Sequence, residues 1–358
     1  MKRFALLTLL VAAVCVSLPA AGQVSITPSV EWAGKVRAYA NPFMDGGAVN
    51  GTITGPLLWS ASTSASLVNR RSDQGAYGRW QRSSTTADDT FQATYQMPAG
   101  QTFQAGTVIA VQSVYTGYYN NLPYEIRLGT DGTATDWSSI APSLTGPGTI
   151  AKKTIRTTTL DGGMYNTFRL DAVPSGYFHA GSEFPLTVDF DEIIILPDRL
   201  EHISDVTVAA SNTSWGNKDF LLGMDNAYDG TNSSSPGWTG SGTLTFTFGL
   251  IDGELPEIDA IVFWSYNNHD ANFTLKYMDN GVEVAVADIS MIREGGRGWT
   301  LPIQLDKSIK SDTIILDFNG TPAGLREVMF FTSAPPIPEP ATLTLLALGG
   351  LAMLRRRR

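Results

Sequence analysis

The sequence predicts an all-β protein built from two tandem β-sandwich, or jelly-roll, domains. Apolar and polar residues alternate in short runs, most clearly at residues 185–196, 243–250 and 313–318. Glycine, asparagine and aspartate separate these runs, and the body of the chain has no long apolar pattern of helical period. Alternation with a period of two places one side of each strand in a core, and many short strands joined by turns are typical of sandwiches and barrels.

Residues 1–22 have the pattern of a secretory signal peptide, which we expect to be removed on export. Lys2 and Arg3 precede an apolar run at 4–18, and small residues follow at 20–22. The only cysteine, Cys15, lies in this segment. The exported part is therefore expected to have no disulfide, so its stability has to come from its cores.

The body of the chain has the same landmarks twice, which predicts one domain at 23–198 and a second at 203–333. The matched segments are NPFMDGGAVNGTITGPLLW (41–59) with DNAYDGTNSSSPGW (225–238), YEIRLGTDGTATDW (124–137) with FTLKYMDNGVEVAV (273–286), NTFRLDAV (166–173) with DTIILDF (312–318), and VDFDEIIIL (188–196) with LREVMFF (325–331). Asp-Gly and Asn-Gly in the second pair accept the positive φ of tight turns, which predicts hairpins. Each copy closes on a strand that carries a glutamate, Glu192 or Glu327.

This order of landmarks resembles that of discoidin-like, galactose-binding-like jelly rolls, more clearly in residues 203–333 than in 23–198. An early Ala-x-Asp-Gly loop precedes Trp238, a middle strand contains Trp264, and a late strand carries Glu327. Trp264 follows three apolar residues in a strand pattern, so we expect it to lie in the core.

The resemblance implies a structural calcium ion in the early loop of the second domain. The implied ligands are the backbone carbonyl of Ala227 and the side chains of Asp229, Thr231, Ser233 and Glu327. These residue types fit, because calcium takes roughly six to eight oxygen ligands. The alternative is a plain polar loop in which Asp229 caps a turn. The first domain offers a set with fewer oxygens nearby: Asp45, Asn50 and Glu192.

The resemblance also implies sugar binding. A sugar site needs an aromatic face for the C–H side of the ring and a few polar groups for the hydroxyls. Trp215 and His269 in the second domain and Trp80 in the first are the candidate ligand-binding residues. The alternative is that aromatic residues of this chain pack inside the sandwiches.

The sequence gives little support for catalysis, and we expect the protein not to be an enzyme. No two of the three histidines have the spacing of a metal pair, and neither a G-x-S-x-G elbow nor a phosphate loop is present. The net charge is −9, and −15 without Lys2, Arg3 and the four terminal arginines. An acidic surface disfavours nucleic acid as a partner.

Residues 335–358 end the chain with Pro-Glu-Pro, an apolar run at 341–354 and four arginines. The run is short for a membrane span, which needs about 20 residues. It can sit in a membrane transiently, with the arginines held on the cytoplasmic side. These features resemble the PEP-CTERM sorting signal of Gram-negative bacteria. The residues that carry the resemblance are Pro338, Glu339, Pro340, Arg355, Arg356, Arg357 and Arg358.

That second resemblance implies export by the general secretion route, transient anchoring in the inner membrane and handling by an exosortase-type membrane protease. The destination is then the cell surface or the extracellular matrix. Together the two resemblances predict a surface protein that binds exopolysaccharide or another glycan, with calcium stabilising its loops. A structural or adhesive matrix protein without a specific ligand is the main alternative, and a polysaccharide-processing enzyme is the third.

Overall fold

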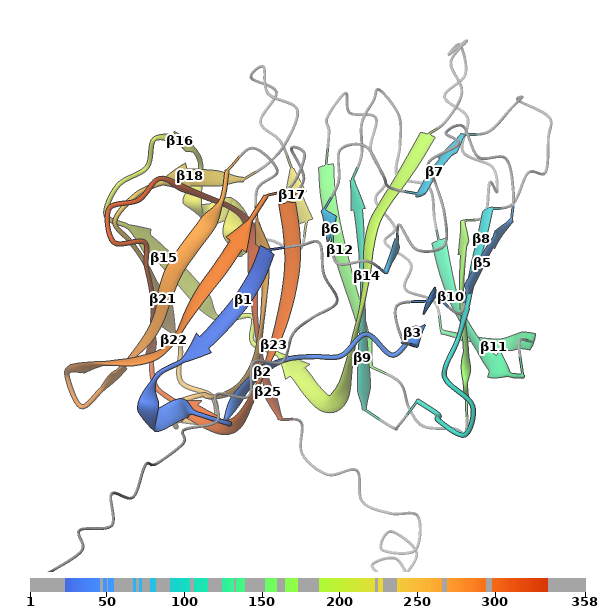
Figure 1. Ribbon diagram of the computed structural model, residues 1–358, viewed down its shortest axis with the longest axis horizontal. Helices are drawn as coiled ribbons and strands as arrows, with labels where there is room; N and C mark the ends of the chain where they lie inside the picture. The colour runs from blue at the N-terminus through green and yellow to red at the C-terminus, as the bar shows by residue number, and fades with distance from the viewer. Residues whose placement is uncertain are drawn as a thin grey trace, which may run out of the picture.

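The structure, a computed structural model, describes residues 23–45, 48–49, 51–54, 67–68, 71–72, 78–81, 91–103, 106–114, 124–131, 133–138, 152–159, 165–172, 187–222, 225–227, 237–265, 269–293 and 298–333. Most of them form antiparallel strands, so the predicted all-β fold is confirmed (Figure 1). The short 3-10 helices η1 (Val30–Trp32) and η3 (Lys218–Leu221) interrupt the strands. Within this described part, no helix is long and apolar enough to cross a membrane. The predicted signal peptide and the C-terminal segment 335–358 lie outside it.

Two outer sheets and one large central sheet make up the fold (Figure 1). In spatial order, outer sheet 1 consists of β11 (Thr133–Ser138), β10 (Tyr124–Thr130), β13 (Thr167–Ala172), β8 (Phe91–Gln96) and β5 (Gly51–Thr54). Outer sheet 2 consists of β1 (Gln23–Pro28), β22 (Val282–Ile292), β21 (Ala271–Asp279), β24 (Thr313–Asp317), β19 (Thr243–Phe248) and β15 (Val206–Ala210).

The central sheet runs continuously from one sandwich into the other. Its path is β17 (Asp225–Ala227), β12 (Lys152–Thr159), β9 (Thr107–Val114), β14 (Thr187–His202), β25 (Ala323–Ser333), β20 (Glu257–Ser265), β23 (Gly298–Lys310) and β2 (Val36–Ala38). Short strands join this path at the side: β7 (Gly78–Gln81) on β14, β18 (Trp238–Gly240) on β25 with β16 (Trp215–Gly216) beyond it, and β6 (Arg71–Ser72) on β23. The hairpin of β3 (Met44–Asp45) and β4 (Ala48–Val49) stands apart.

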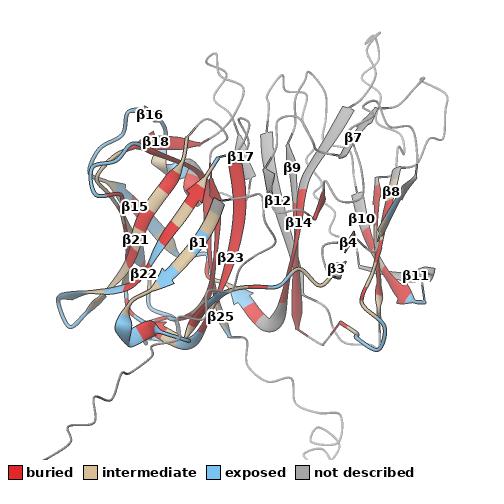
Figure 2. Cartoon of the chain, in the orientation of Figure 1, coloured by how far each residue is buried: buried red, intermediate tan, exposed pale blue. Residues whose placement is uncertain are grey.

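Three apolar cores hold these layers together (Figure 2). The first sandwich packs outer sheet 1 on β9 and β14 around Phe43, Tyr95 and Phe168, and the rings of Phe43 and Tyr95 stack at 5.0 Å. The second sandwich packs outer sheet 2 on β20, β23 and β25. A third core joins the two arms of the central sheet and contains Trp264, which is fully buried as predicted.

The predicted internal repeat is confirmed by the strand order. Outer sheet 1 runs β11-β10-β13-β8-β5, and outer sheet 2 repeats it as β22-β21-β24-β19-β15, with β1 added at one edge. In the central sheet, β12-β9-β14 corresponds to β23-β20-β25, and β7 beside β14 corresponds to β18 beside β25. Three of the four matched segment pairs therefore occupy equivalent strands: the hairpins, β13 with β24, and β14 with β25.

The alignment of the remaining pair, residues 41–59 with 225–238, was wrong. Asp45 lies in the β3–β4 hairpin, which precedes β5, whereas Asp229 belongs to the connection between β17 and β18, after the equivalent strand β15. The two Asp-Gly dipeptides therefore occupy different places in the repeat. A dipeptide of turn-forming residues recurs too often to fix an alignment by itself.

The predicted domain limits need correction at the N-terminal end. β1 pairs with β22 and β2 pairs with β23, so residues 23–38 belong to the second sandwich and not to a domain at 23–198. β6 likewise reaches from the first half of the chain to β23, and β17 reaches from the second half to β12. Backbone pairing, and not the order along the chain, thus decides to which sandwich each of these segments belongs. An open sheet edge can pair with any strand that presents matching backbone groups.

Replacing Trp32 by alanine tests the transfer of the N-terminal segment to the second sandwich. Trp32 is 1% exposed in that core, and its ring meets Tyr277 edge-on at 6.0 Å. We expect Trp32→Ala to lower the free energy of unfolding by about 3–5 kcal/mol, measured by urea denaturation. The neighbouring Val30, which is 95% exposed, supplies the control Val30→Ala, with an expected change within about 0.5 kcal/mol. Equal effects of the two variants would contradict this placement.

His202 makes the junction between the sandwiches sensitive to pH. It pairs with Phe331, the two rings meet edge-on at 5.5 Å, and burial lowers the pKa of His202 from 6.5 to about 4. Between these two pKa values the unfolded chain binds more protons than the folded chain. The stability contributed by neutral His202 is therefore fully present above pH 6.5 and is lost as the pH falls towards 4. We expect a loss of about 2 kcal/mol, after discounting for partial exposure. His202→Gln should remove this part of the pH dependence in urea denaturation series, and an unchanged slope would contradict it.

Candidate functional site

Glu192 and Glu327, the two glutamates predicted to close the copies, occupy equivalent positions. Each follows a β-bulge. Asp191 is one extra residue in β14 relative to β9, and Arg326 is one extra residue in β25 relative to β20. Both glutamates are fully buried. A bulge redirects the side chains next to it, which accounts for a carboxylate inside an otherwise apolar strand.

Glu192 borders a small cavity between the layers. The cavity has a volume of about 10 Å³ and is lined by Ala40, Asn41, Glu192, Ile193, Ile194, Ile195 and Pro302. That volume holds about one water molecule, so no sugar can enter here. Burial and the charge of Glu192 together raise the pKa of Tyr95 well above its ordinary value. Glu192 thus lies in the structural interior and not on a ligand surface.

The implied calcium ligands are only partly within the described residues. Ala227 ends β17 opposite Lys152, and Glu327 lies in β25, whereas Asp229, Thr231 and Ser233 fall outside the description. Trp238 pairs with Leu325, so the chain that returns from this loop reaches β25 two residues before Glu327. In the first copy Asp45 pairs through its backbone with Ala48, and Asn50 is outside the description. The described residues contain no group of three acidic, histidine or cysteine side chains that could hold a metal.

Two of the predicted sugar-binding residues lie at the same end of the second sandwich. Trp215, 37% exposed, stands opposite Thr239, and Thr239 stands opposite Gly324 at the start of β25. The amide of Gly324 donates to the carbonyl oxygen of Asp270, the neighbour of the half-buried His269. Successive backbone pairs therefore bring Trp215 and the His269 connection to one edge. We call this edge, formed by β16, β18, the start of β25 and residues 269–270, the tryptophan end.

Local contacts explain why the chain can present Trp215 there. Gly216 has φ 80°, and a Cβ at this residue would lie 2.0 Å from the carbonyl oxygen of Gly237, so only glycine allows β16 to approach β18. Below it, the indole of the buried Trp238 donates to the hydroxyl of Thr213 at 2.9 Å. The third predicted residue, Trp80, lies in β7 opposite Val188, and β7 is the equivalent of β18. The structure therefore places Trp80 in the other sandwich, apart from Trp215 and His269.

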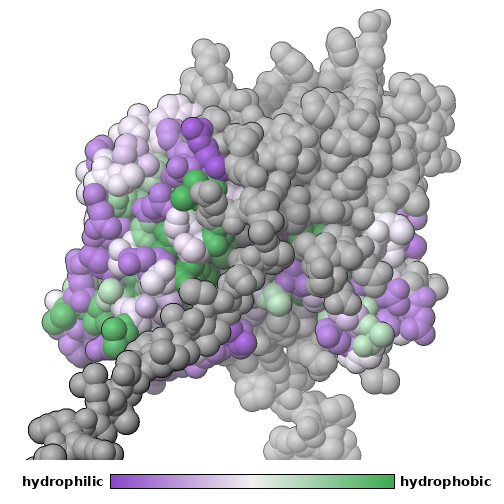
Figure 3. Space-filling view, in the orientation of Figure 1, coloured by the Kyte–Doolittle hydropathy of each residue, from purple (hydrophilic) through white to green (hydrophobic). Residues whose placement is uncertain are grey.

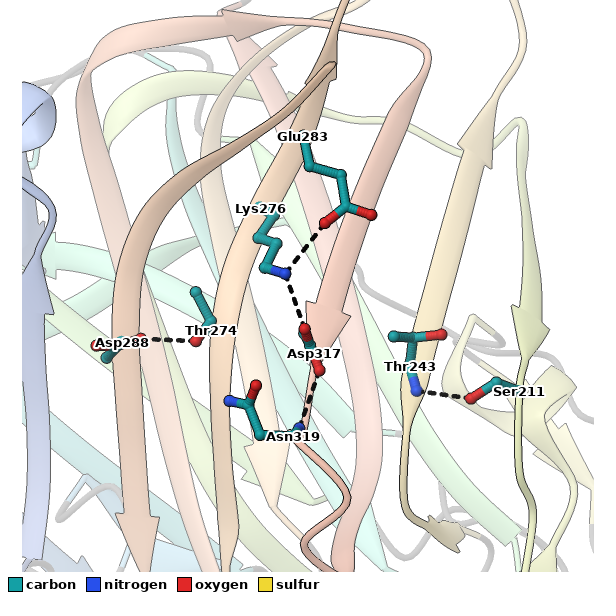
Figure 4. Close-up of polar contacts among 8 residues, drawn as sticks. All are labelled: Ser211, Thr243, Thr274, Lys276, Glu283, Asp288, Asp317 and Asn319. Carbon is teal, nitrogen blue, oxygen red and sulfur yellow. Dashed lines mark hydrogen bonds and ion pairs between the residues drawn. The ribbon is translucent and has the colours of Figure 1, made fainter. Parts of the chain in front are cut away.

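The exposed face of outer sheet 2 carries a network of polar contacts (Figure 4). The Lys276 ammonium donates to Asp317 at 2.8 Å and to Glu283 at 3.0 Å, and Thr274 donates to Asp288 at 2.7 Å. These contacts raise the pKa of Lys276, chiefly through Asp317, and lower that of Asp317, chiefly through Lys276. Lys276 is thus paired with two acids within the protein.

Outer sheet 1 carries a cluster that the sequence analysis missed. Asp171 is 2% exposed and accepts a hydrogen bond from the Nη2 of Arg169 at 2.9 Å. It also forms ion pairs with the Nε of Arg169 at 2.7 Å and with the Nε of Arg127 at 3.0 Å. The arginine side chains are 31% exposed at Arg127 and 22% at Arg169. The available signal was the alternation of charged residues with core residues along β10 and β13, where Ile126, Leu128, Phe168 and Leu170 face inward.

Exposed apolar side chains gather at the opposite end of the second sandwich from the tryptophan end. They belong to η1, the β19–β20 connection and the β21–β22 turn: Val30, Leu250, Ile251, Leu255 and Val282. Figure 3 shows apolar surface at this lower end and also in the middle of the face above it. β25 runs from the tryptophan end towards this end, where it finishes at Ser333.

Comparison with known proteins gives one match in sequence and several in structure. Residues 336–358 match the family description "PEP-CTERM protein-sorting motif". No curated protein matches the chain. Among solved structures, a family 32 carbohydrate-binding module of C. perfringens NanJ in complex with galactose has 15% identity and a TM-score of 0.28, covering 37% of this chain and 98% of that one.

Two further solved structures show the same range of similarity. A chitosan-binding module from Paenibacillus sp. IK-5 has 18% identity and a TM-score of 0.26, covering 44% of this chain and 99% of that one. An allantoicase has 15% identity and a TM-score of 0.28, covering 78% and 90%. These scores are low, so the interpretation rests on the strand order and side chains of the chain itself. The sorting motif is thus found where the sequence predicted it, directly after the last described strand.

Proposed function

We propose that this is an exported surface protein that binds carbohydrate without catalysing a reaction on it. The observation that carries the proposal is the sorting motif at residues 336–358, which follows directly from β25. Because β25 runs away from the tryptophan end, a tail held at a membrane leaves that end turned outwards. An exposed tryptophan beside polar loops, presented away from the membrane, is suited to a sugar ring and its hydroxyls.

The proposed route of delivery follows from the two ends of the chain. The signal peptide at 1–22 directs secretion, and the apolar run at 341–354 halts in the inner membrane with Arg355–Arg358 on the cytoplasmic side. An exosortase-type membrane protease then acts on the Pro338-Glu339-Pro340 segment. The product is retained at the surface or in the exopolysaccharide matrix of a Gram-negative-type cell.

Calcium at the loop before β18 is the second part of the proposal. Glu327 is a fully buried carboxylate in the strand that receives the end of this loop, so an acidic side chain stands near the point where the loop returns to the sheet. Asp229, Thr231, Ser233 and the carbonyl of Ala227 would supply further oxygens. The ion would fix the loop that leads into the tryptophan end.

A structural or adhesive matrix protein is the alternative. The exposed apolar side chains at the lower end of the second sandwich favour it, since such surface promotes contact between copies. We assign no catalytic residue. The third alternative, an enzyme of polysaccharide processing, would be supported by an activity that is lost when a single acidic residue is replaced. Saturable glycan binding separates the binding protein from the matrix protein, which shows self-association or no glycan interaction.

Glycan binding at the tryptophan end is tested with a panel of immobilised neutral and acidic polysaccharides. We expect saturable binding by the wild-type protein and an affinity about tenfold lower for Trp215→Ala, because stacking against an exposed aromatic face is lost. Leu250→Ala, at the opposite end, is the matched control and should bind as the wild type does. A protein that binds no member of the panel would contradict the function, and self-association in its place would support the structural alternative.

The calcium site is tested by thermal unfolding in EDTA and in calcium. A ligand that binds only the folded state raises the melting temperature by mass action. We expect calcium to raise the Tm of the wild type and to leave Asp229→Ala unchanged, while Asp219→Ala, an exposed acid on η3, should respond like the wild type. Equal Tm values of the wild type in both conditions would remove calcium from the proposal.

A further inference from the structure

The end of the second sandwich opposite the tryptophan end carries most of the exposed apolar side chains. Within the described part of the chain, five of the six large apolar side chains that are exposed lie there, and the sixth is Trp215. The five are Val30, Leu250, Ile251, Leu255 and Val282, which are between 39% and 95% exposed. Single exposed apolar residues are common on protein surfaces, whereas a group at one end of one domain indicates an interaction site. We call these five residues the apolar end.

Contacts between neighbouring segments hold the apolar end together. The ring of Trp32 in η1 meets Tyr277 of β21 edge-on at 6.0 Å. The carbonyl oxygen of the next residue in β21 accepts a hydrogen bond from the hydroxyl of Ser311 at 2.8 Å. The amide of Ser311 donates in turn to the carbonyl oxygen of Pro256, which directly follows Leu255. η1, the end of β21 and the β19–β20 connection therefore lie side by side.

Two tight turns present apolar residues at this end. Residues 252–253 and 280–281 have φ values between 50° and 82°, as tight hairpin turns of type I′ require. Ile251 directly precedes the first turn, and Val282 directly follows the second. The equivalent turn of the first sandwich, between β10 and β11, has Thr133 in the place of Val282. In this hairpin the apolar residue thus occurs in the sandwich that leads into the sorting motif.

The last strand of the body ends beside the apolar end. The amide of Ser333, the last residue of β25, donates to the carboxylate of Asp259 at 2.7 Å. Asp259 lies in β20, four residues after Leu255. Residues 334–340 connect Ser333 to the apolar run that begins at Ala341. This connection spans at most about 30 Å even when it is fully extended. A sorting segment inserted in a bilayer therefore holds the apolar end close to the lipid surface.

We propose that the apolar end rests on the surface of the bilayer in which the sorting segment is inserted. The chain itself brings this bilayer to the apolar end at a high effective concentration, so a modest apolar contact is sufficient. Glu31, Asp252 and Glu254 are exposed among the apolar residues and would be repelled by anionic headgroups, so zwitterionic lipid fits this end best. This inference rests on the proposed insertion of residues 341–354 and adds a second contact with the bilayer, made by the folded body.

The experiment places an environment-sensitive dye at each end of the second sandwich. In a Cys15→Ser background, Val282→Cys labels the apolar end. Asn212→Cys labels the tryptophan end, because the carbonyl oxygen of Asn212 lies close to Gly240 of β18. The protein is exported by a bacterial host without an exosortase, so that the sorting segment stays on the chain, and is reconstituted in phosphatidylcholine vesicles with nitroxide groups on the upper acyl chains.

We expect the lipid nitroxides to quench the dye at position 282 and not the dye at position 212. Apolar groups in contact with a bilayer surface lie about 5–10 Å into it, so the emission at position 282 should fall at least about twofold. The dye at position 212, which the fold holds at the far end of the sandwich, should keep its emission.

Two substitutions that add the same charge locate the contact, both with the dye at position 282. Leu250→Asp places a carboxylate in the apolar end and should remove most of the quenching, because a charged group resists transfer from water into lipid. Asn212→Asp adds that charge at the tryptophan end and should change nothing. Leu250 is 61% exposed, so the fold should tolerate its replacement, and urea denaturation verifies this. If Leu250→Asp does not fold, Val30→Asp replaces it, at a residue that is 95% exposed.

The outcomes separate this inference from the route of delivery on which it rests. In a vesicle-bound protein, absent quenching at position 282, equal quenching at both positions or quenching unchanged by Leu250→Asp overturns the lipid contact and leaves insertion of the sorting segment in place. Energy transfer between labelled copies through position 282, without quenching by lipid, would assign the apolar end to a second copy and also overturn it. A protein that does not float with the vesicles overturns the proposed insertion together with this inference.

Discussion

The arrangement of the whole molecule depends on the double pairing of β14. This strand of 16 residues pairs with β9 in the first sandwich and, through Leu200, Glu201 and His202, with the end of β25 in the second. An unpaired edge on either sandwich would expose backbone amide groups to other chains, and the pairing closes both at once. It also brings two apolar sheet faces together over Trp264. Exposure of these faces to water would cost the free energy that burying their apolar surface contributes. The orientation of every surface on one sandwich is therefore fixed relative to the other.

Exchanged segments strengthen this junction. The N-terminal strand β1 completes outer sheet 2, β6 joins β23, and β17 joins β12, so each half of the chain contributes backbone to the sandwich of the other. Separate unfolding of either half would break strand pairs in both. The chain therefore has two repeats in its strand order but one connected central sheet in its hydrogen bonding, which explains why limits drawn along the sequence could not match the structure.

Local patterns in the sequence predicted the strands and the hairpins well. Alternation marked β14, β19 and β24, and the turns at Asp131 and Asn280 have the positive φ of 51° and 50° that the Asp-Gly and Asn-Gly dipeptides indicated. Trp264 was correctly placed in a core from its apolar neighbours. The pairing of Gln23 with Ile292 could not be predicted, because hydrophobic period states which face of a strand is buried and not which strand it joins. The bulges at Asp191 and Arg326 could not be predicted either, because a bulge is a shift of register against the partner strand and the partner is not known from the sequence.

Comparison of the two outer sheets shows which polar contacts occur in both copies of the repeat. A basic residue on the neighbouring strand, diagonal to the strand-end acid, is present in both sheets, at 2.8 Å in Lys276–Asp317 and 3.0 Å in Arg127–Asp171, as expected for a contact that the repeated fold itself requires. Position 169 lies beside that contact and differs, being arginine in one copy and, at 315, isoleucine in the other. The repeated fold forms with either residue, so it does not need a second cation at this position.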